Sequence, residues 1–386
     1  MRIAVIGAGH AGVEAATFSS GAGAEVELYS AEAGLPYFRP RVVALAFGAS
    51  DPEAMRMHPG GWYADRKIDM RSNTPVTAID TSALRLTAGG ASTPFDAIVV
   101  AIGAGPALPS VAARAPNGAI PLWNEAHALR IGERALRGNR RVLVVGGGTI
   151  GVEAAIRAAQ AGCEVTVIDK APGLLSSSLD DTESDLVRRY LESRNVRVRT
   201  LTELAAVRDL DGEVEAVFGD GSVGMYEVAV LSVGVRRDLR LAHAAGLTTG
   251  SGVRADAFLQ TSRPGIFVCG DIAQTDGALT CSAREAAAQG RAAAFNAVAH
   301  AAGEPAGLRP WPRRPSLLSL RVHDFEVHVA GWPVKGPFVE EVLPGDGAGT
   351  RRVVVRQRDR IVAVRMVGTH RDLQALVEQI PTEGVA

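Results

Sequence analysis

Short apolar runs alternate along this chain with longer alanine-rich stretches of mixed polarity. Two of the runs, residues 3–6 and 142–145, are each followed directly by a glycine-rich segment and then by an alanine-rich stretch. Apolar runs this short predict buried strands, and a longer stretch behind a glycine turn predicts a helix. The pattern therefore predicts two strand, turn and helix units in an α/β protein.

The two glycine-rich segments are GAGHAG at residues 7–12 and GGGTIG at residues 146–151, and the sequence around them repeats at a constant offset of 139 residues. In a GxGxxG segment between a strand and a helix, the first glycine permits a tight turn and the second lets the backbone approach a pyrophosphate. The third lets the helix pack closely on its strand. Amide groups at the helix start then hold the phosphates. The glycines in these positions are Gly7, Gly9 and Gly12 in the first segment and Gly146, Gly148 and Gly151 in the second. Two such units in register predict two Rossmann-like domains and two bound nucleotides.

The residue at the end of the second strand of such a unit contacts the adenosine ribose. In the second unit it is Asp169, whose carboxylate would accept hydrogen bonds from the ribose hydroxyls and repel a 2'-phosphate. This predicts a preference for NADH over NADPH, which the neighbouring Lys170 could soften. The first unit has Ser30 at the equivalent position, and Glu32 is a candidate to replace the missing acid.

Further segments are consistent with nucleotide binding. Residues 95–103 and 226–234 are alike, and each predicts a buried strand that ends beside a nucleotide; the candidate contacts there are Ala101, Gly103 and Gly234. Residues 264–271 predict a strand followed by Gly-Asp, and residues 283–299 predict a helix. Asp271 at the end of that strand is a candidate to hydrogen-bond a ribityl hydroxyl.

Composition narrows the function classes. The chain has 386 residues, 47% hydrophobic and 22% charged, which is enough for two or three cores. A formal net charge of -1 gives no reason to expect nucleic acid or an anionic membrane as the main partner. The apolar runs are too short to span a bilayer, and the chain enters its first strand without a signal segment, so we expect a cytoplasmic protein.

Other reactive groups are few. The three cysteines, Cys163, Cys269 and Cys281, form no CxxC or CxxxxC pair, which argues against a disulfide framework. Cys281 begins the predicted helix 283–299, and the sequence leaves open whether its thiol packs or reacts. The eight histidines have no ligand spacing, so no metal is expected, and there is no GxSxG or HExxH motif of a hydrolase.

The order of these segments resembles the FAD-dependent pyridine nucleotide-disulfide oxidoreductase superfamily, over roughly residues 1–300. In that glutathione-reductase-like fold an FAD domain is interrupted by an NAD domain and followed by a small interface domain. The chain is most similar to the rubredoxin reductase and ferredoxin reductase group, which lacks a redox-active disulfide. The Pro-Tyr-Phe-Arg-Pro sequence at residues 36–40, the absence of a cysteine pair and the short length carry this resemblance.

The resemblance implies an enzyme with FAD and NADH as cofactors and gives roles to four residues. Arg39 would lie against the isoalloxazine, Val76 near the adenine, Asp271 at the ribityl chain and Glu153 near the nicotinamide. Arg39 and Glu153 are therefore the candidate catalytic residues.

Two departures from the family pattern matter. Arg39 stands where rubredoxin reductases have lysine, and Ala44 stands where ferredoxin reductases have lysine. An arginine keeps the positive charge, but its pKa cannot be tuned. The alternative is that Arg39 only anchors a loop. Glu153 also has an alternative explanation, because Glu14 occupies the same place in the first unit and glutamates near a helix start are favoured by the helix dipole.

Proline- and glycine-rich crossings predict three domains. Residues 1–112 and 241–306 would form a discontinuous FAD domain, residues 118–240 an NAD domain, and residues 310–386 a small α+β interface domain. In this last domain, residues 325–329, 353–355 and 361–364 predict strands and residues 372–380 a helix. Trp311 and Trp332 could gate the flavin or simply pack.

The predicted reaction passes hydride from NADH to FAD and then electrons to a small carrier, a rubredoxin or [2Fe-2S] ferredoxin by family resemblance. Such carriers are commonly acidic, so Arg313, Arg314 and Arg321 are candidates for a docking surface, with a merely solvated face as the alternative. An NADH oxidase and a quinone- or nitrite-linked reductase stay open, as does a non-catalytic nucleotide-binding redox sensor. The chain would act as a monomer or homodimer.

Overall fold

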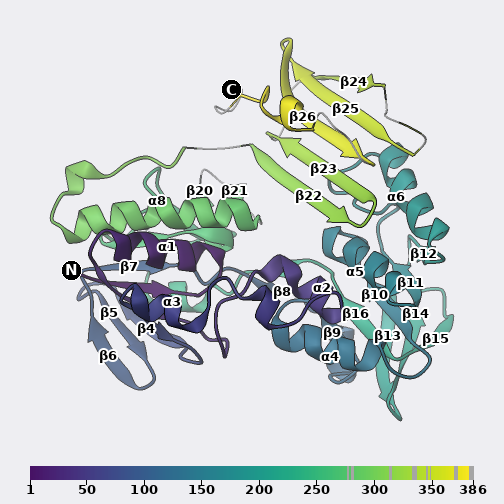
Figure 1. Cartoon of the computed structure of the whole chain (residues 1–386), viewed down its shortest axis with the longest axis horizontal. Coiled ribbons are helices and arrows are strands. Elements are labelled where there is room, and N and C mark those ends of the chain that lie inside the picture. Colours follow the sequence, from purple (N-terminus) through teal and green to yellow (C-terminus); the bar gives the residue numbers. More distant parts are fainter. Residues whose placement is uncertain are drawn as a thin grey trace. The chain divides into compact units, whose positions relative to one another are not determined.

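A computed structural model describes residues 1–275, 278–279, 282–312, 315–332, 337–344, 347, 349–368 and 373–381. The chain divides into two compact units, each assembled from separate stretches of sequence (Figure 1). Unit 1 comprises Met1–Pro40, Glu53–Gly105 and Arg236–Pro312, and unit 2 comprises Arg41–Pro52, Pro106–Val235 and Arg313–Ala386.

Unit 1 is built on a five-stranded parallel sheet of order β19-β7-β1-β2-β3. Its strands are β1 (Arg2–Ile6), β2 (Glu25–Tyr29), β3 (Ile68–Arg71), β7 (Ala97–Val100) and β19 (Ile266–Val268). The short apolar runs of the sequence become the central strands because a sheet covered on both faces needs apolar side chains at every position. All residues of β7 and β19 are buried.

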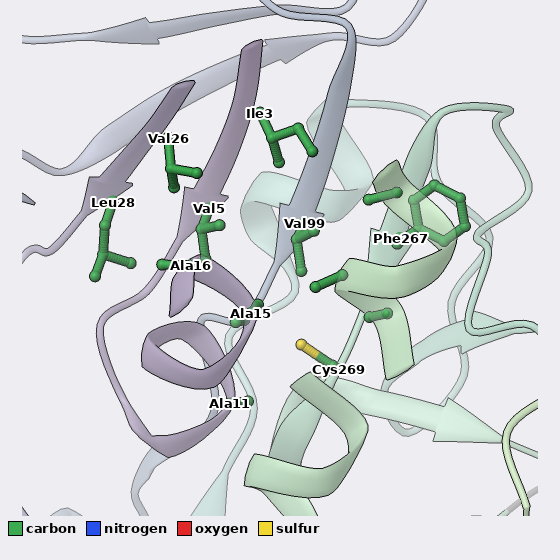
Figure 2. Packing of buried hydrophobic residues seen from close by; sticks show 14 of the residues in the cluster. Ile3, Val5, Ala11, Ala15, Ala16, Val26, Leu28, Val99, Phe267 and Cys269 are labelled. Carbon is green, nitrogen blue, oxygen red and sulfur yellow. The ribbon is translucent and has the colours of Figure 1, made fainter. Parts of the chain in front are cut away.

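Two alanine-rich helices, α1 (His10–Gly21) and α8 (Ala283–Ala301), pack against each other in unit 1. Their backbones approach so closely that a Cβ atom on Gly290 would lie 2.1 Å from the Ala11 carbonyl oxygen. Figure 2 shows the small side chains of α1 beside Val5 of β1, with Phe267 and Cys269 in the same core. Small residues thus bring the helix start close to the end of β1.

The remaining elements of unit 1 surround this core. One antiparallel sheet contains β4 (Val76–Asp80), β5 (Arg85–Ala88) and β6 (Ala91–Pro94), and a second sheet contains β18 (Val253–Ala255), β20 (Ala273–Thr275) and β21 (Ala278–Leu279). The short helices are α3 (Gly60–Asp65) and α7 (Arg240–Ala244), with 3-10 turns at Arg39–Arg41, Glu53–Met55, Gly270–Ile272 and Pro305–Gly307. Trp311 packs against the core of this unit.

Unit 2 repeats the parallel architecture with the order β12-β11-β10-β16-β9. Its strands are β9 (Ala119–Pro121), β10 (Arg141–Val145), β11 (Glu164–Ile168), β12 (Arg197–Arg199) and β16 (Val228–Leu231). Its helices are α2 (Val42–Ala46), α4 (Glu125–Ala135), α5 (Thr149–Gln160) and α6 (Asp181–Ser193), with a 3-10 turn at Ser110–Arg114 between α2 and α4. An antiparallel sheet contains β13 (Leu204–Leu210), β14 (Glu213–Phe218) and β15 (Val223–Tyr226). The two-residue strands β8 (Gly105–Pro106) and β17 (Val235–Arg236) fall at sequence borders of the units.

The C-terminal part of unit 2 is an antiparallel sheet of order β22-β23-β26-β25-β24, followed by α9 (Leu373–Val377). Its strands are β22 (Ser316–Val322), β23 (Phe325–Gly331), β24 (Val339–Leu343), β25 (Arg351–Gln357) and β26 (Arg360–Val367). Trp332 packs on the core of this sheet, and its Nε1 donates to the Pro381 carbonyl, 2.7 Å away. The sequence predicted β23, β25, β26 and the helix but not β24, whose residues are mostly exposed at the sheet edge.

Within the described ranges, no helix is both long and apolar enough to cross a membrane. The same ranges contain no group of three or more histidine, cysteine or acidic side chains placed to hold a metal ion.

Candidate functional site

The first glycine loop joins β1 to α1, and two of its glycines are required by close backbone approaches. Gly7 has a φ of +105°, and a Cβ atom there would lie 2.3 Å from the carbonyl oxygen of Ala101. A Cβ atom on Gly12 would lie 1.7 Å from the Gly7 carbonyl oxygen. Any side chain at either position would displace backbone. The structure thus brings Ala101, which follows β7, to the border of the loop.

The second loop joins β10 to α5 and repeats this geometry. Gly146 also has a φ of +105°, and its Cβ atom would lie 2.2 Å from the Ser232 carbonyl oxygen. A Cβ atom on Gly151 would lie 1.8 Å from the Gly146 carbonyl oxygen. The first and third glycines of both loops therefore serve the turn and the helix packing, as the sequence predicted.

The middle glycines, Gly9 and Gly148, have a different environment. Among the described residues, no atom lies within 4 Å of a Cβ atom built on either glycine. Each glycine is the N-cap of its helix, and no side chain caps that helix start. The amide groups of the first turn and the positive end of the helix dipole therefore lie next to a glycine that places no side chain in the way of a ligand. This arrangement fits a dinucleotide pyrophosphate at each loop.

His10, the first residue of α1, supports this conclusion for the first loop. Its Nε2 atom is buried and has no hydrogen-bond partner in the described part of the chain, and its ring packs edge-on against Phe38 with the centroids 4.9 Å apart. Burial, assisted by the charge of Arg39, lowers the pKa of His10 to about 4, so the ring is neutral at physiological pH. Buried polar atoms are normally paired, and a nucleotide bound at this loop can supply the partner.

The end of β2 holds a small polar cluster of Ser30, Glu32, Tyr37 and Arg39. The Ser30 hydroxyl accepts a hydrogen bond from the Glu32 amide at 3.1 Å. The Glu32 carboxylate accepts one from the Tyr37 hydroxyl at 2.6 Å and pairs with the Arg39 guanidinium at 2.5 Å. The guanidinium also lies 5.3 Å from the centre of the Tyr37 ring. Three residues that the sequence analysis selected, Ser30, Glu32 and Arg39, are therefore neighbours.

Asp271 belongs to the same neighbourhood. It lies in the turn Gly270–Ile272 after β19, where the Gly270 amide donates to the side chain of Gln289 on α8 at 2.9 Å. Burial raises the pKa of Asp271, and the charges of Arg237 and Arg39 oppose that rise. Arg237 also donates to the Asp271 backbone carbonyl. Gln289 is almost fully buried and was not predicted, because one glutamine on an alanine-rich helix has no sequence signal.

Three further candidate residues for nucleotide contact are Val76 and Gly103 in unit 1 and Gly234 in unit 2. Val76 of β4 is half-buried and packs against the cluster that contains Ile6 and Tyr29, the last residues of β1 and β2. Gly103 and Gly234 have φ angles of +66° and +107°, and no atom of the residues that the structure describes lies within 4 Å of an added Cβ atom. Both glycines adopt a backbone conformation that other residues rarely enter.

Asp169 follows β11 and lies beside the second loop. One carboxylate oxygen accepts a hydrogen bond from the Gly147 amide at 2.5 Å, and the other accepts one from the Ala171 amide at 2.7 Å. Two backbone donors thus fix the orientation of this carboxylate. Lys170 is exposed. The structure places a rigid negative charge next to the glycine loop, where the sequence analysis expected a ribose contact.

Glu153 lies in the first turns of α5 and forms an ion pair with Arg157 of the same helix at 2.7 Å. Burial raises the pKa of Glu153, and the neighbouring Arg157 opposes the rise. Its counterpart Glu14 on α1 pairs instead with Arg291 of α8 at 2.9 Å. Equivalent glutamates therefore have different partners, which a helix-dipole role alone does not require.

The two cysteines that the structure describes are not placed to react as thiolates. Cys163 and Cys269 are both buried, and burial raises the pKa of each thiol, that of Cys269 to about 12. Cys281, Arg313 and Arg314 lie outside the described residues. Arg321 is exposed on β22, with its guanidinium 3.9 Å from the Glu326 carboxylate.

Comparison with known proteins gives consistent results. A family model described as pyridine nucleotide-disulphide oxidoreductase matches residues 1–300. The chain is 32% identical over 393 residues to the ferredoxin–NAD(+) reductase component of the anthranilate 1,2-dioxygenase system of Burkholderia cepacia, covering 96% of this chain and 92% of that protein. It is 30% identical over 279 residues to rubredoxin-NAD(+) reductase of Ectopseudomonas oleovorans, covering 71% and 72% of the two chains.

Solved structures share the fold at lower identity. A chain in the crystal structure of the covalent putidaredoxin reductase-putidaredoxin complex matches with a TM-score of 0.85 and 23% identity, covering 98% of this chain and 94% of that one. The ferredoxin reductase of the CYP199A2 system from Rhodopseudomonas palustris matches with a TM-score of 0.83 and 23% identity, covering 95% and 91%. The α/β fold with two Rossmann-like cores and an additional C-terminal sheet, predicted from the sequence, is confirmed.

Proposed function

The chain belongs to the pyridine nucleotide-disulphide oxidoreductase family, and from that premise we propose that it takes hydride from NADH and passes electrons through FAD to a small carrier protein of the rubredoxin or [2Fe-2S] ferredoxin class. As a member of this family it is an FAD-dependent oxidoreductase of pyridine nucleotides. The observation that carries the proposal is the pair of matching glycine loops, each with open space at its middle glycine.

We assign FAD to the first loop. A bound flavin supplies a ring that accepts hydride and releases electrons singly. The α1 amide groups beside Gly9 would hold its pyrophosphate, and Asp271 would bind the ribityl hydroxyls. Arg39 would add positive charge near the ring, since Glu32 and Tyr37 hold its guanidinium in place. The partnerless Nε2 of His10 would gain a hydrogen bond from the cofactor.

NADH is assigned to the second loop, with its pyrophosphate at Gly148. The Asp169 carboxylate, fixed by the amides of Gly147 and Ala171, favours a ribose with free hydroxyls. A 2'-phosphate at the same place would meet a negative charge that cannot turn away. Glu153 would contact the nicotinamide end. Both curated relatives carry NAD(+) in their names, in agreement with this preference.

The acceptor follows from two considerations. The chain has three cysteines and none forms a CxxC or CxxxxC pair, so a redox-active dithiol of that kind is absent from the sequence. Electrons must then leave the flavin directly. The curated relatives are named for ferredoxin and rubredoxin, which are small one-electron carriers. A carrier of this chemical class is the acceptor that these names support.

Steady-state kinetics test the proposal. Purified holoprotein is mixed with NADH and either a rubredoxin or a [2Fe-2S] ferredoxin without oxygen, and carrier reduction is followed by absorbance. We expect turnover within the ordinary enzyme range of roughly 1 to 1,000 per second. In a parallel sample without carrier, oxygen uptake should be much slower. Equal rates in the two samples would favour an oxidase, and negligible turnover in both would favour a nucleotide-binding sensor.

A further inference from the structure

A short segment between β11 and α6, residues 170–179, covers one side of the second glycine loop. The Leu175 amide donates to the Gly147 carbonyl at 2.9 Å. The side chain of Leu174 lies 2.4 Å from the place where a Cβ atom on Gly147 would be. Both leucines are buried. Any shift of this segment would therefore change its contacts with Gly147 in the loop.

The segment contains a strained residue. Leu175 has a φ of +55°, in the left-handed region that non-glycine residues seldom occupy. Such a conformation persists only where surrounding contacts enforce it. Residues 170–179 should consequently change conformation if those contacts are weakened. The residues that make these contacts therefore also affect the second glycine loop.

Helix α6 provides the contacts. The Ser184 hydroxyl donates to the Leu174 carbonyl at 2.7 Å, and the Ser184 side chain leaves no room for a Cβ atom on Gly173. The helix starts in a capping box, in which the Asp180 side chain accepts from the Glu183 amide at 2.8 Å. The Glu183 side chain accepts from the Asp180 amide at 3.0 Å. The first turn of α6 is thus a defined support for the segment.

Arg365 of β26 holds the first turn of α6. The Arg365 guanidinium donates to Glu183 at 2.8 Å and to Asp180 at 3.3 Å, and it binds both carboxylate oxygens of Glu340 on β24, at 2.9 and 3.0 Å. The Glu183 side chain is 0% exposed and that of Arg365 is 14% exposed. A carboxylate buried so completely needs a charged partner nearby, so the pair strongly favours one position of α6.

The other end of α6 is also fastened to the C-terminal sheet. The Tyr190 ring stacks on Phe325 with centroids 4.1 Å apart, and the Asp324 carboxylate binds the Tyr190 hydroxyl and the Arg194 guanidinium, each at 2.5 Å. Contacts at both ends prevent the helix from pivoting about either one. The C-terminal sheet therefore helps to fix the position of α6, which also packs against β12 of the parallel sheet.

We propose that Arg365 is a positioning residue for the pyridine nucleotide. Through Glu183, Ser184 and Leu174 it holds residues 170–179 against the second glycine loop and thereby sets the affinity for NADH. The C-terminal sheet thus acts on a nucleotide site in the preceding Rossmann-like fold. This inference rests on the proposed assignment of the second loop to NADH.

The test is a double-mutant cycle on NADH affinity. The dissociation constant of NADH is obtained from the concentration dependence of flavin bleaching in anaerobic stopped-flow experiments, for holoprotein of the wild type, R365Q, S184A and the double variant. Removing one hydrogen bond in S184A should weaken binding about fivefold, and R365Q should weaken it by at least as much. The double variant should be weaker than either single variant, but by less than the product of their effects, because both residues act on Leu174. The bleaching rate at saturating NADH and the flavin content should stay unchanged.

The controls separate positioning from general stability. R356Q breaks the exposed pair of Arg356 with Glu341 in the same sheet, 2.9 Å apart, and should leave NADH affinity unchanged. If R365Q does not fold, R365K is the substitute, because it keeps the charge but loses the fork that reaches several carboxylates at once. Wild-type affinity in the Arg365 variant, or effects that multiply fully, would overturn the inference. A wild-type protein that NADH does not bleach would instead overturn the proposed function.

Discussion

The two glycine loops have the same backbone geometry but different surroundings. Gly7 and Gly146 share a φ of +105°, and Cβ atoms on Gly12 and Gly151 would lie 1.7 and 1.8 Å from the corresponding carbonyl oxygens. The sequence offset of 139 residues nevertheless pairs Ser30 with Asp169 and His10 with Thr149. The loop geometry can hold a pyrophosphate in both units, so the surrounding side chains must decide which nucleotide each unit binds.

The acids near the two loops illustrate this difference. In unit 1 the acid that follows the strand end is Glu32, which is engaged by Tyr37 and Arg39. In unit 2 Asp169 is held by backbone amides beside the loop itself. A carboxylate fixed by neutral amides keeps its negative charge for the ligand, whereas one paired with arginine is largely neutralised. We therefore expect the second loop, and not the first, to select between ribose and ribose 2'-phosphate.

The largest expected effect comes from the third glycine of each loop. We expect G12A and G151A each to destabilise the protein by about 1 to 3 kcal/mol, because the new methyl group overlaps a carbonyl oxygen. G12A should also lose bound flavin, while G151A should keep its flavin and lose bleaching by NADH. Thermal melting, the flavin-to-protein absorbance ratio and anaerobic NADH addition measure these outcomes.

The middle glycines provide the matched control for that pair. G9A and G148A place a methyl group in open space, so their melting temperatures should equal that of the wild type. Their nucleotides should bind more weakly, since the methyl group lies where the pyrophosphate approaches. If G151A lost flavin as completely as G12A does, the assignment of different nucleotides to the two loops would be wrong.

Asp169 can be replaced by serine, the residue that Ser30 provides at the equivalent place in unit 1. This substitution removes the carboxylate that distinguishes the two strand ends. D169S should lower the ratio of kcat/KM for NADH to that for NADPH by roughly 10- to 100-fold, the value of a hydrogen bond to a charged group. Steady-state kinetics with both nucleotides give the ratio. E164Q, at the exposed start of the same strand, removes an equal charge and should leave the ratio unchanged. An unaltered ratio in D169S would show that specificity lies elsewhere.

The equivalent glutamates, Glu153 and Glu14, test the catalytic assignment. E153Q should slow flavin reduction at saturating NADH about tenfold if, as we propose, the half-buried Glu153 carboxylate contacts the nicotinamide. E14Q should have no such effect, since Glu14 pairs with Arg291 in the other unit. Stopped-flow absorbance measures both rates. Equal slowing in the two variants would show that Glu153 has no specific catalytic role and acts only as a glutamate near a helix start.

The smallest effect concerns His10, which H10T converts to the residue of the second loop. Burial and Arg39 lower the pKa of His10 from 6.5 to about 4. Between these pH values the unfolded chain binds a proton that the folded protein does not, so the free energy of unfolding falls as pH falls through this window. In H10T this dependence should be shallower by at most about 1.4 kcal/mol per pH unit. Urea unfolding of the flavin-free protein from pH 4 to 7 tests this, and identical slopes would contradict it.

Features of the sequence that act locally were predictable. A glycine loop between an apolar run and an alanine-rich stretch needs only neighbouring residues to be recognised, and Gly7, Gly12, Gly146 and Gly151 have the backbone approaches expected of them. The strand-end position of Asp169 follows from the same local pattern.

Contacts between distant parts of the chain were not predictable. The partners of Arg365 include Glu183, nearly half the chain away, and no periodicity links an arginine in one strand to the start of a distant helix. The contact of Gln289 and the strand β24 were not predicted for related reasons. A single polar residue on an alanine-rich helix and a largely exposed edge strand produce no recognisable sequence pattern. The packing of Ala46 against Gly132, where a Cβ atom would lie 2.9 Å from the Ala46 carbonyl oxygen, likewise depends on the folded chain.

An anaerobic absorbance titration of the purified protein tests directly whether the first loop binds FAD and the second binds NADH. One equivalent of NADH is added to the holoprotein, with NADPH in a parallel sample. We expect a flavin band that NADH bleaches at once and NADPH bleaches far more slowly. A protein that shows no flavin band even after FAD is added, or a flavin band that neither nucleotide bleaches, would contradict the account.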